Sequence, residues 1–294
     1  MYCFGCLRPS YFRPKFSSQN IRLALAAALV AVVVGIFAVT GPSSASADRP
    51  AAGSAGSWRN ADDVVIARNF PDGLPAGLVN LSVGERKRIF VETVLPLVLR
   101  ENEHIRATRA KLLALDARRV GGGGLSSGDR SWLEGLAKLY RVPDADVDEL
   151  ARRVDVVPPS LAIAQAAEES GWGTSRFARL GNALFGQWTS VRGEGIVPLG
   201  RDDGPHHEVK AYQALAESVR DYMRNLNTHS AYKDLRQLRA QKRSAGLPPA
   251  GHDLSAALVR YSARGENYVR SLRTIIRVNR FGALDAARLD PPRA

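Results

Sequence analysis

Cysteine is scarce in this sequence of 294 residues: Cys3 and Cys6 are the only two, and both precede its long apolar run. Two thiolates do not complete a four-coordinate zinc site. The rest of the chain has no cysteine with which to form a disulfide, and no cysteine follows the apolar run to mark a lipoprotein cleavage site. That part of the protein must therefore be stabilised by a hydrophobic core alone, for which the chain is long enough.

The histidine spacing of a zinc protease is also missing. The motif H-E-x-x-H would need a second histidine after His207 and Glu208, where Ala211 stands instead. Because the pair of ligands at i and i+4 is incomplete, the sequence disfavours a metalloprotease, and neither a metal nor another cofactor is expected.

Basic residues are abundant but form no extended run, although the formal net charge is +12. Nucleic-acid binding is therefore not expected. A basic surface suits an anionic polymer or a membrane, and the alternative is a simple compositional preference for arginine.

The longest apolar run, Leu23–Val39, is flanked in the manner of an export signal. It spans about 17 residues, near the lower limit for crossing a bilayer. Residues 1–47 are therefore expected to form either a cleaved signal peptide or an inner-membrane anchor, with the remainder in the periplasm; a buried core helix is the alternative. The basic residues before the run are Arg8, Arg13, Lys15 and Arg22, and Ala45-Ser46-Ala47 follows it.

The rest of the chain is expected to be mainly α-helical. Residues 48–81 have a linker composition, 82–282 are predicted to form one domain, and 283–294 to form a tail. The apolar spacing after Ser82 is helical, with a kink or break expected at Pro96. Glycines and a turn signal between Ala183 and Tyr212 predict a small antiparallel β-hairpin.

One predicted helix, "PPSLAIAQAAEES", ends in two adjacent acids, Glu168 and Glu169. On a helical wheel Glu169 lies beside Ala162 and Ala166, which leave room for a groove next to its carboxylate. A carboxyl beside an aromatic surface such as Trp172 has its pKa raised toward the range of a general acid. The alternative is a solvated pair of glutamates, although acids at a helix C-terminus oppose the helix dipole.

The segments "AQAAEESGWGTSRFA" and "GNALFGQW" resemble the glucosaminidase-domain family of peptidoglycan hydrolases, in particular its Bax-like bacterial members, which are related to the FlgJ hydrolase domain. Later blocks, "HHEVKAYQALAESVRDYMRN" and "YSARGENYVRSLRTIIRVN", extend the resemblance over about 82–281. Ala183 stands where the family has the second asparagine of N-N-L-F-G.

This resemblance implies a lysozyme-like helical domain with a small β-hairpin beside the catalytic groove. It implies hydrolysis of the β-1,4 bond after N-acetylglucosamine in peptidoglycan glycan strands, with Glu169 as general acid. Glu168 is then either a neighbour that raises the pKa of Glu169 by like-charge repulsion or a surface acid, the interpretation that we favour. The second catalytic group is expected to be Glu208, with Glu194 as its rival, or else the acetamido group of the substrate itself.

The resemblance also implies that Tyr261 lines the catalytic groove. Phe185 and Tyr268 have core packing as their alternative interpretation. Two other functions remain open: a lytic transglycosylase acting on the same glycan, and a wall-binding or morphogenetic protein without catalysis. The full set of expected substrate-binding residues is Gln165, Trp172, Asn182, Phe185, Trp188, Tyr212 and Tyr268.

Overall fold

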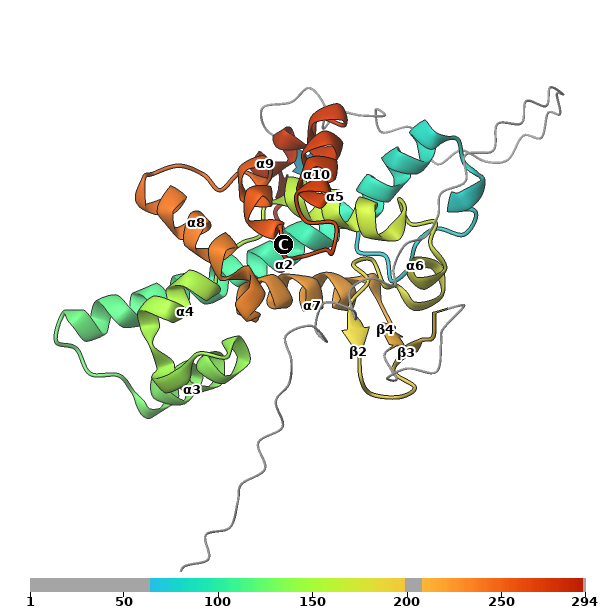
Figure 1. The fold of residues 1–294 in the computed structure, drawn as a ribbon. Helices are drawn as coiled ribbons and strands as arrows, with labels where there is room; N and C mark the ends of the chain where they lie inside the picture. Colours follow the sequence, from blue (N-terminus) through green and yellow to red (C-terminus); the bar gives the residue numbers. More distant parts are fainter. Residues whose placement is uncertain (1–63, 199–207, 293–294) are drawn as a thin grey trace, which may run out of the picture. The chain divides into compact units, whose positions relative to one another are not determined.

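The computed structural model describes residues 64–198 and 208–292. The expected leader and most of the expected linker lie outside these residues, so the interpretation of the apolar run stays a prediction. Within the described part the fold is mainly helical (Figure 1), as the sequence indicates. No helix in that part is both long and apolar enough to cross a membrane. Its α-helices are α2 (Val83–Val120), α3 (Ser127–Tyr140), α4 (Val147–Arg153), α5 (Pro159–Ser170), α6 (Arg176–Gly181), α7 (Leu215–Thr228), α8 (Lys233–Ser244), α9 (Gly251–Leu254) and α10 (Glu266–Val278).

Helix α2 runs for 38 residues and passes through Pro96 without ending. A proline inside a helix removes one backbone hydrogen bond and disfavours the preceding turn. Here Pro96 lies within the buried part of the helix, next to Leu95 and Leu97, which are each 1% exposed. We attribute the continuity to this burial, because the packing of both flanks outweighs one missing hydrogen bond. The expected break is therefore absent.

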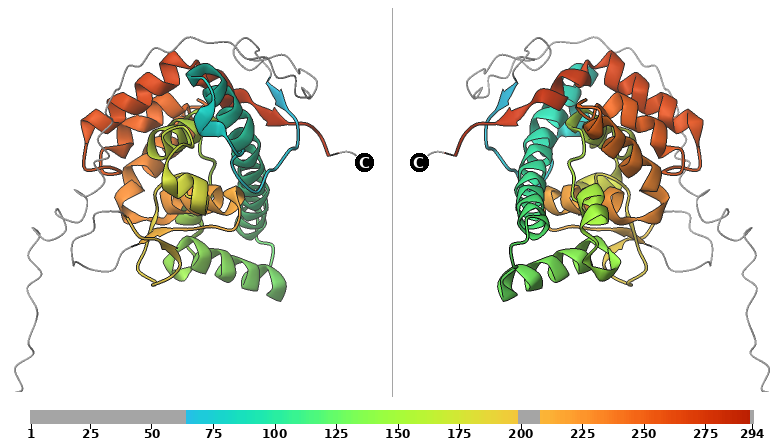
Figure 2. Two further views of the ribbon diagram at one scale, coloured as in Figure 1. Left: turned by 90° about the vertical axis from the view of Figure 1, so that its right-hand side faces the viewer. Right: turned by 90° about the vertical axis from the view of Figure 1, so that its left-hand side faces the viewer.

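Helix α5 lies in the centre of the domain, between α2 and α10 (Figures 1 and 2). Its small side chains explain this position, because alanines let neighbouring helices approach closely. Ala162, Ala164 and Ala166 are fully buried, and so are Leu161 and Ile163. A helix that is apolar on all sides is stable only when it is surrounded in this way. The two acids at its end therefore emerge directly from the hydrophobic core.

The N-terminus of α5 is held by a residue from the far end of the chain. The carboxylate of Asp285 accepts hydrogen bonds from the backbone N–H of Ser160 at 2.9 Å, from the Ser160 hydroxyl at 2.8 Å and from the N–H of Gly251 at 2.9 Å. It thereby satisfies free amides at the starts of both α5 and α9. Asp285 lies in the short 3₁₀-helix η6 (Phe281–Ala286).

The chain on both sides of the expected domain belongs to the folded structure. Strand β1 (Val65–Ile66) pairs in parallel with β5 (Arg288–Leu289), and η2 (Leu78–Asn80) contacts α2. Leu78, Leu284 and Leu289 are buried. Residues 64–81 and 283–292 therefore differ from the linker and tail that their composition suggests. The reason is that short strands and single apolar anchors carry too little periodicity to be recognised.

The small β element is a three-stranded antiparallel sheet with the order β2-β4-β3. This sheet confirms the expected antiparallel β element. It has one strand more than a hairpin, because β4 pairs with both β2 and β3. Gly195 has no space for a side chain, because a Cβ there would lie 2.7 Å from the Cβ of Glu208. Asp202 and Asp203 lie outside the described residues. The strands are β2 (Trp188–Thr189), β3 (Gly195–Ile196) and β4 (Glu208–Lys210).

Gly251→Ala is predicted to destabilise the protein by about 2 kcal/mol or more. A Cβ at this position would lie 2.6 Å from the backbone nitrogen of Leu161 and closer still to the Ser160 hydroxyl, so α5 and α9 would have to separate. Urea unfolding of the purified protein measures the loss. Gly84→Ala is the control, because a Cβ at that position would meet nothing within 4 Å, and it should leave stability unchanged or raise it by up to about 1 kcal/mol. Equal stability of the wild type and Gly251→Ala would contradict the packing described here.

Candidate active site

Glu169 lies in the last turn of α5, half-buried, with its carboxyl group bound to the hydroxyl of Tyr268. Burial raises the pKa of Glu169 from its ordinary value of 4.5 to about 7. The hydrogen bond from Tyr268 acts in the opposite direction, as does the charge of Arg264, whereas the charge of Glu168 raises the pKa further. A carboxylic acid that keeps its proton near neutral pH is able to act as a proton donor.

Four tyrosines lie within the electrostatic influence of this carboxyl group, and we call Tyr222, Tyr232, Tyr261 and Tyr268 the tyrosine cluster. The rings of Tyr261 and Tyr268 stack at 5.3 Å between centroids, and those of Tyr232 and Tyr261 lie 5.7 Å apart. Burial raises the pKa of each of the four phenols, and the negative charge of Glu169 contributes in every case. The hydroxyls therefore remain protonated and available as hydrogen-bond donors near neutral pH.

Gln165, one turn before Glu169, fixes two members of the tyrosine cluster. Its amide Nε2 donates to the hydroxyl of Tyr268 at 3.0 Å, and its Oε1 accepts from the hydroxyl of Tyr222 at 2.7 Å. The side chain is 0% exposed. The sequence suggests that Gln165 contacts substrate, but the structure places it behind the tyrosines, where it orients the groups that contact Glu169.

The segment after α5 turns sharply because three consecutive residues adopt the left-handed conformation: Gly171, Trp172 and Gly173, with φ of 58°, 59° and 78°. The Ser170 hydroxyl accepts a hydrogen bond from the N–H of Gly173 at 2.9 Å and closes the turn. Gly173 is required sterically as well, since a Cβ there would lie 2.8 Å from a methyl group of Leu78.

Trp172, expected in the sugar-binding wall, packs against α2 and η6. Its ring lies 5.8 Å from that of Phe90 and 6.2 Å from that of Phe281, and the ammonium group of Lys87 lies 4.7 Å from its centroid. These contacts attach the end of α5 to the core. The aromatic residue that binds the carboxyl group of Glu169 directly is Tyr268.

The segment Asn182–Gly186 passes close to Glu169. A Cβ at Gly186, whose φ is 60°, would lie 3.9 Å from Oε2 of Glu169. Asn182 is also left-handed, at φ 52°, and its amide donates to the carbonyls of Tyr212 and Gln213 at 3.2 Å each. Phe185 is 3% exposed. Its ring stacks on Tyr222 at 3.8 Å, so its contacts are those of packing within the site.

Glu208 and Glu194 both belong to the small sheet, but in different environments. Glu208 is 6% exposed, and its carboxylate accepts hydrogen bonds from the N–H groups of Gly193 and Gly195 at 2.9 to 3.2 Å. It therefore holds the connection between β2 and β3. Glu194 is exposed, and its carboxylate accepts from the hydroxyl of Thr189 at 3.3 Å.

The remaining expected residues, Trp188 and Tyr212, flank the same sheet. Trp188 is 49% exposed at the start of β2, opposite Val209 of β4. Tyr212 is 9% exposed, and its hydroxyl lies between Oε1 of Gln187 at 2.7 Å and the carboxylate of Asp221 at 2.9 Å. Tyr212 thus joins the sheet to α7, whereas Trp188 presents an exposed aromatic surface.

Glu168, beside the candidate acid, forms an ion pair with Arg264, which also donates to the hydroxyl of Ser271 at 2.8 Å. This pairing fits the interpretation of Glu168 as a surface acid. The sequence did not indicate Arg264 as a site residue, nor Tyr222 and Tyr232. Tyr222 follows the apolar period of α7, and that spacing is equally typical of an ordinary core residue.

Within residues 64–198 and 208–292, no group of three or more His, Cys, Asp or Glu side chains is placed to hold a metal ion. The surroundings of Glu169 combine a half-buried carboxyl group of raised pKa with a hydrogen bond from Tyr268 and the nearby backbone of Gly186.

Comparisons with known proteins agree with the family resemblance. Residues 144–281 match the glucosaminidase family, described as mannosyl-glycoprotein endo-beta-N-acetylglucosaminidase. The Escherichia coli K12 protein named Protein bax is 33% identical over 207 residues, which cover 68% of this chain and 69% of that relative. Among solved structures, the catalytic domain of the autolysin Auto from Listeria monocytogenes is similar at 20% identity, with a TM-score of 0.34, over 58% of this chain and 96% of that one.

Glu169→Gln is predicted to stabilise the protein above neutral pH. Because the folded state holds the proton of Glu169 more tightly than the unfolded chain does, this group favours folding fully below pH 4.5 and loses that contribution as the pH rises toward about 7. The neutral amide that the substitution introduces cannot ionise, so its contribution to stability stays the same at every pH. The difference in unfolding free energy should therefore grow from pH 4.5 to 7 and then level off at no more than about 3 kcal/mol.

Thermal and urea unfolding at several pH values measure this difference. Glu168→Gln is the matched control, since its half-exposed ion pair with Arg264 should contribute under about 1 kcal/mol. A stability difference for Glu169→Gln that does not depend on pH would show that the carboxyl group is not held protonated.

Proposed function

The chain belongs to the glucosaminidase family, and on that premise we propose that it is an exported peptidoglycan hydrolase that cleaves the β-1,4 bond after N-acetylglucosamine. The observation that carries the proposal is the position of Glu169 at the end of α5, where burial raises its pKa to about 7, Tyr268 binds its carboxyl group and the backbone of Gly186 lies close by. The motif around it, E-S-G-W-G, is the one that the family resemblance assigns to the general acid.

In this mechanism the carboxyl group of Glu169 gives its proton to the glycosidic oxygen as the bond to the sugar carbon breaks. The sugar then carries developing positive charge, and a water molecule adds to it and releases a proton to the second catalytic group or to the carboxylate of Glu169. Glu169 is left as a carboxylate beside Tyr268, whose hydroxyl stabilises that charge by a hydrogen bond. Proton donation of this kind typically accelerates a reaction by about 10² to 10⁴.

The second catalytic group is open between three candidates. Glu208 is occupied by backbone N–H groups of Gly193 and Gly195, which favours a role in holding the sheet. Glu194 is exposed on the same sheet and is freer to approach a sugar. The acetamido group of the substrate is the third candidate, because substrate-assisted glycosidases need no second carboxylate.

Export to the periplasm, with or without retention of an inner-membrane anchor, is part of the proposal. It rests on the order of basic residues, apolar run and Ala-Ser-Ala at the N-terminus, which lies outside the described residues. The net charge of +12 supports binding to the acidic groups of a cell wall.

Glu169→Gln is predicted to lower turnover on purified peptidoglycan by about 10² to 10⁴, because the amide has no proton to give at neutral pH. Products reduced with borohydride are identified by mass spectrometry, with Glu168→Gln as the adjacent control that should stay active. New reduced N-acetylglucosamine ends from the wild type support the proposal. Anhydromuramic ends would indicate a lytic transglycosylase, and binding without any new ends would indicate a non-catalytic wall protein.

The pH profile of kcat/KM is predicted to fall above about pH 7, since Glu169 must be protonated to react. Two variants should move this limb in opposite directions. Arg264→Gln removes a positive charge that lowers the pKa of Glu169, so the limb should shift to higher pH. Glu168→Gln removes a negative charge that raises that pKa, so the limb should shift to lower pH. Shifts in the same direction would contradict the assignment of the limb to Glu169.

A further inference from the structure

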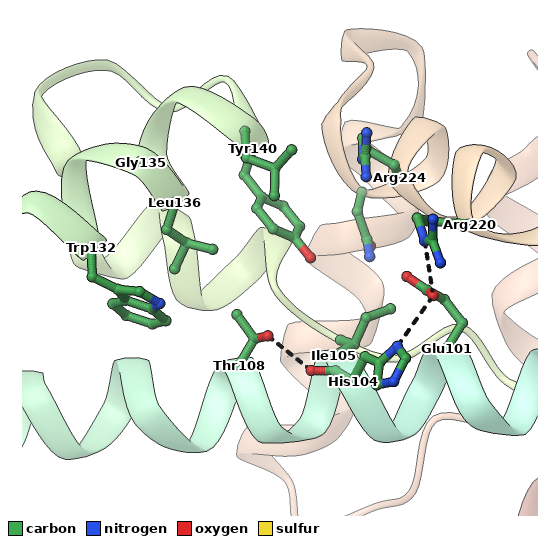
Figure 3. A pocket seen from close by; sticks show the side chains of 12 residues that line it. Glu101, His104, Ile105, Thr108, Trp132, Gly135, Leu136, Tyr140, Arg220 and Arg224 are labelled. Atoms are coloured by element: carbon green, nitrogen blue, oxygen red, sulfur yellow. Dashed lines mark hydrogen bonds and ion pairs between the residues drawn. The ribbon is translucent and has the colours of Figure 1, made fainter. Parts of the chain in front are cut away.

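A pocket lies away from Glu169, between α2, α3 and α7 (Figure 3). Its volume is about 470 Å³, and it is lined by Trp132 and Tyr140 of α3, by Glu101 and His104 of α2, and by Arg220 and Arg224 of α7. A cavity of this size is typical of sites that hold small molecules or a few residues of peptide.

The charges in this pocket are not balanced by the protein. Of the described residues that line it, Glu101 alone is acidic, whereas Arg220 and Arg224 are both basic. Its carboxylate lies 3.5 Å from Nε of Arg220 and 3.7 Å from Nδ1 of His104, both longer than normal hydrogen bonds (Figure 3). The guanidinium group of Arg224 has no hydrogen-bond or ion-pair partner among the residues that the structure describes.

Aromatic side chains accompany this positive charge. Trp132 is half-buried beside the pocket, and the ammonium group of Lys111 lies 4.3 Å from its ring centroid. Tyr140 is 8% exposed, and burial raises the pKa of its phenol, so its hydroxyl stays a donor near neutral pH. An unpaired guanidinium group beside aromatic and aliphatic surface is suited to a ligand that carries a carboxylate on a partly apolar chain.

Helix α7 connects this pocket with the candidate active site. Arg220, Arg224 and Asn227 follow each other at i, i+4 and i+7 and line the pocket. Tyr222 projects from another face of the same helix, toward Gln165 and Phe185. One helix, about 10 Å across, thus separates the pocket from the tyrosine cluster. Helices α2 and α3, which form the other walls, precede the family match at 144–281.

We propose that this pocket binds the acidic peptide stem of peptidoglycan, through a carboxylate held by Arg224 and an apolar contact with Trp132. The proposal rests on the proposed function, because a polymer of sugars substituted with acidic peptides presents both groups to the protein at once. The glycan then meets Glu169 while a stem of the same polymer occupies the pocket, so that the extension formed by α2 and α3 serves substrate recognition.

The first test is calorimetric titration of the whole protein with a synthetic stem tetrapeptide, alanyl-γ-glutamyl-diaminopimelyl-alanine. Arg224→Gln is expected to weaken binding about tenfold or more, because a charge-assisted hydrogen bond is lost. Arg277→Gln removes the same charge from an exposed position of α10 and should bind like the wild type. The same peptide with its carboxyl groups amidated should bind the wild type as weakly as the free peptide binds Arg224→Gln.

No binding by the wild type would overturn the proposal. So would equal affinity of the wild type and Arg224→Gln, or equal affinity for the free and amidated peptides. These outcomes do not depend on hydrolysis. A wild type that binds the peptide but cleaves nothing would refute the proposed function and leave the pocket assignment intact.

The second test compares cleavage of intact peptidoglycan with cleavage of glycan strands from which the peptides have been removed enzymatically. Arg224→Gln should raise KM on the intact polymer about tenfold and leave kcat and the activity on bare strands unchanged. Equal losses on both substrates would mean that Arg224 acts on the fold or on catalysis, and would contradict a role in peptide binding.

Discussion

The candidate active site depends on two hydrogen bonds made by one buried amide. Gln165 has no contact with solvent, so both of its polar atoms must find partners inside the protein. The hydroxyls of Tyr222 and Tyr268 are those partners, at 2.7 and 3.0 Å. Because each tyrosine stacks on a further ring, Phe185 or Tyr261, one side chain of α5 sets the relative positions of α7, α10 and the segment Asn182–Gly186. The donor that reaches Glu169 is therefore held by the core and not by the surface.

A carboxyl group lies at each end of α5, Asp285 of η6 at the N-terminus and Glu169 at the C-terminus, and the two environments differ. Asp285 at the N-terminus accepts hydrogen bonds from two backbone amides and a hydroxyl, where the helix dipole also favours negative charge. Glu169 at the C-terminus meets no such amides, and the dipole there opposes ionisation. Burial raises the pKa of both groups; three donors offset this effect at Asp285, whereas the hydroxyl of Tyr268 offsets it at Glu169. The contacts of Asp285 thus stabilise the N-terminal end of the helix. At the C-terminal end, the raised pKa of Glu169 keeps a proton available but lowers the stability of the fold above pH 7.

Sequence reasoning succeeded where a feature is local. The small-residue pattern of α5, its termination at Gly171 and the position of Glu169 on the helix all follow from neighbouring residues. It failed where partners are distant in sequence: the hydroxyl of Tyr222 is 57 residues from Gln165, and Asp285 is 125 residues from Ser160. A site tyrosine and a core tyrosine have the same helical spacing, so periodicity alone does not separate them. Trp172 shows the same limit, because its position next to a candidate acid does not reveal that its ring packs against Phe90 and Phe281.

Helix α7 contributes residues to the small sheet's contacts, to the tyrosine cluster and to the pocket between α2, α3 and α7. Its apolar face places Tyr222 in the core. Asp221, the preceding residue, binds Lys210 and Tyr212 and so fixes the sheet, while Arg220 and Arg224 line the pocket against α3. Successive positions on a helix point in directions about 100° apart, so adjacent residues of one rigid element serve three different surfaces. A displacement of α7 would alter the tyrosine cluster, the contact with the sheet and the pocket at the same time. Close packing of its buried face prevents such a displacement. The complete burial of Val219, Met223 and Leu226 shows this packing.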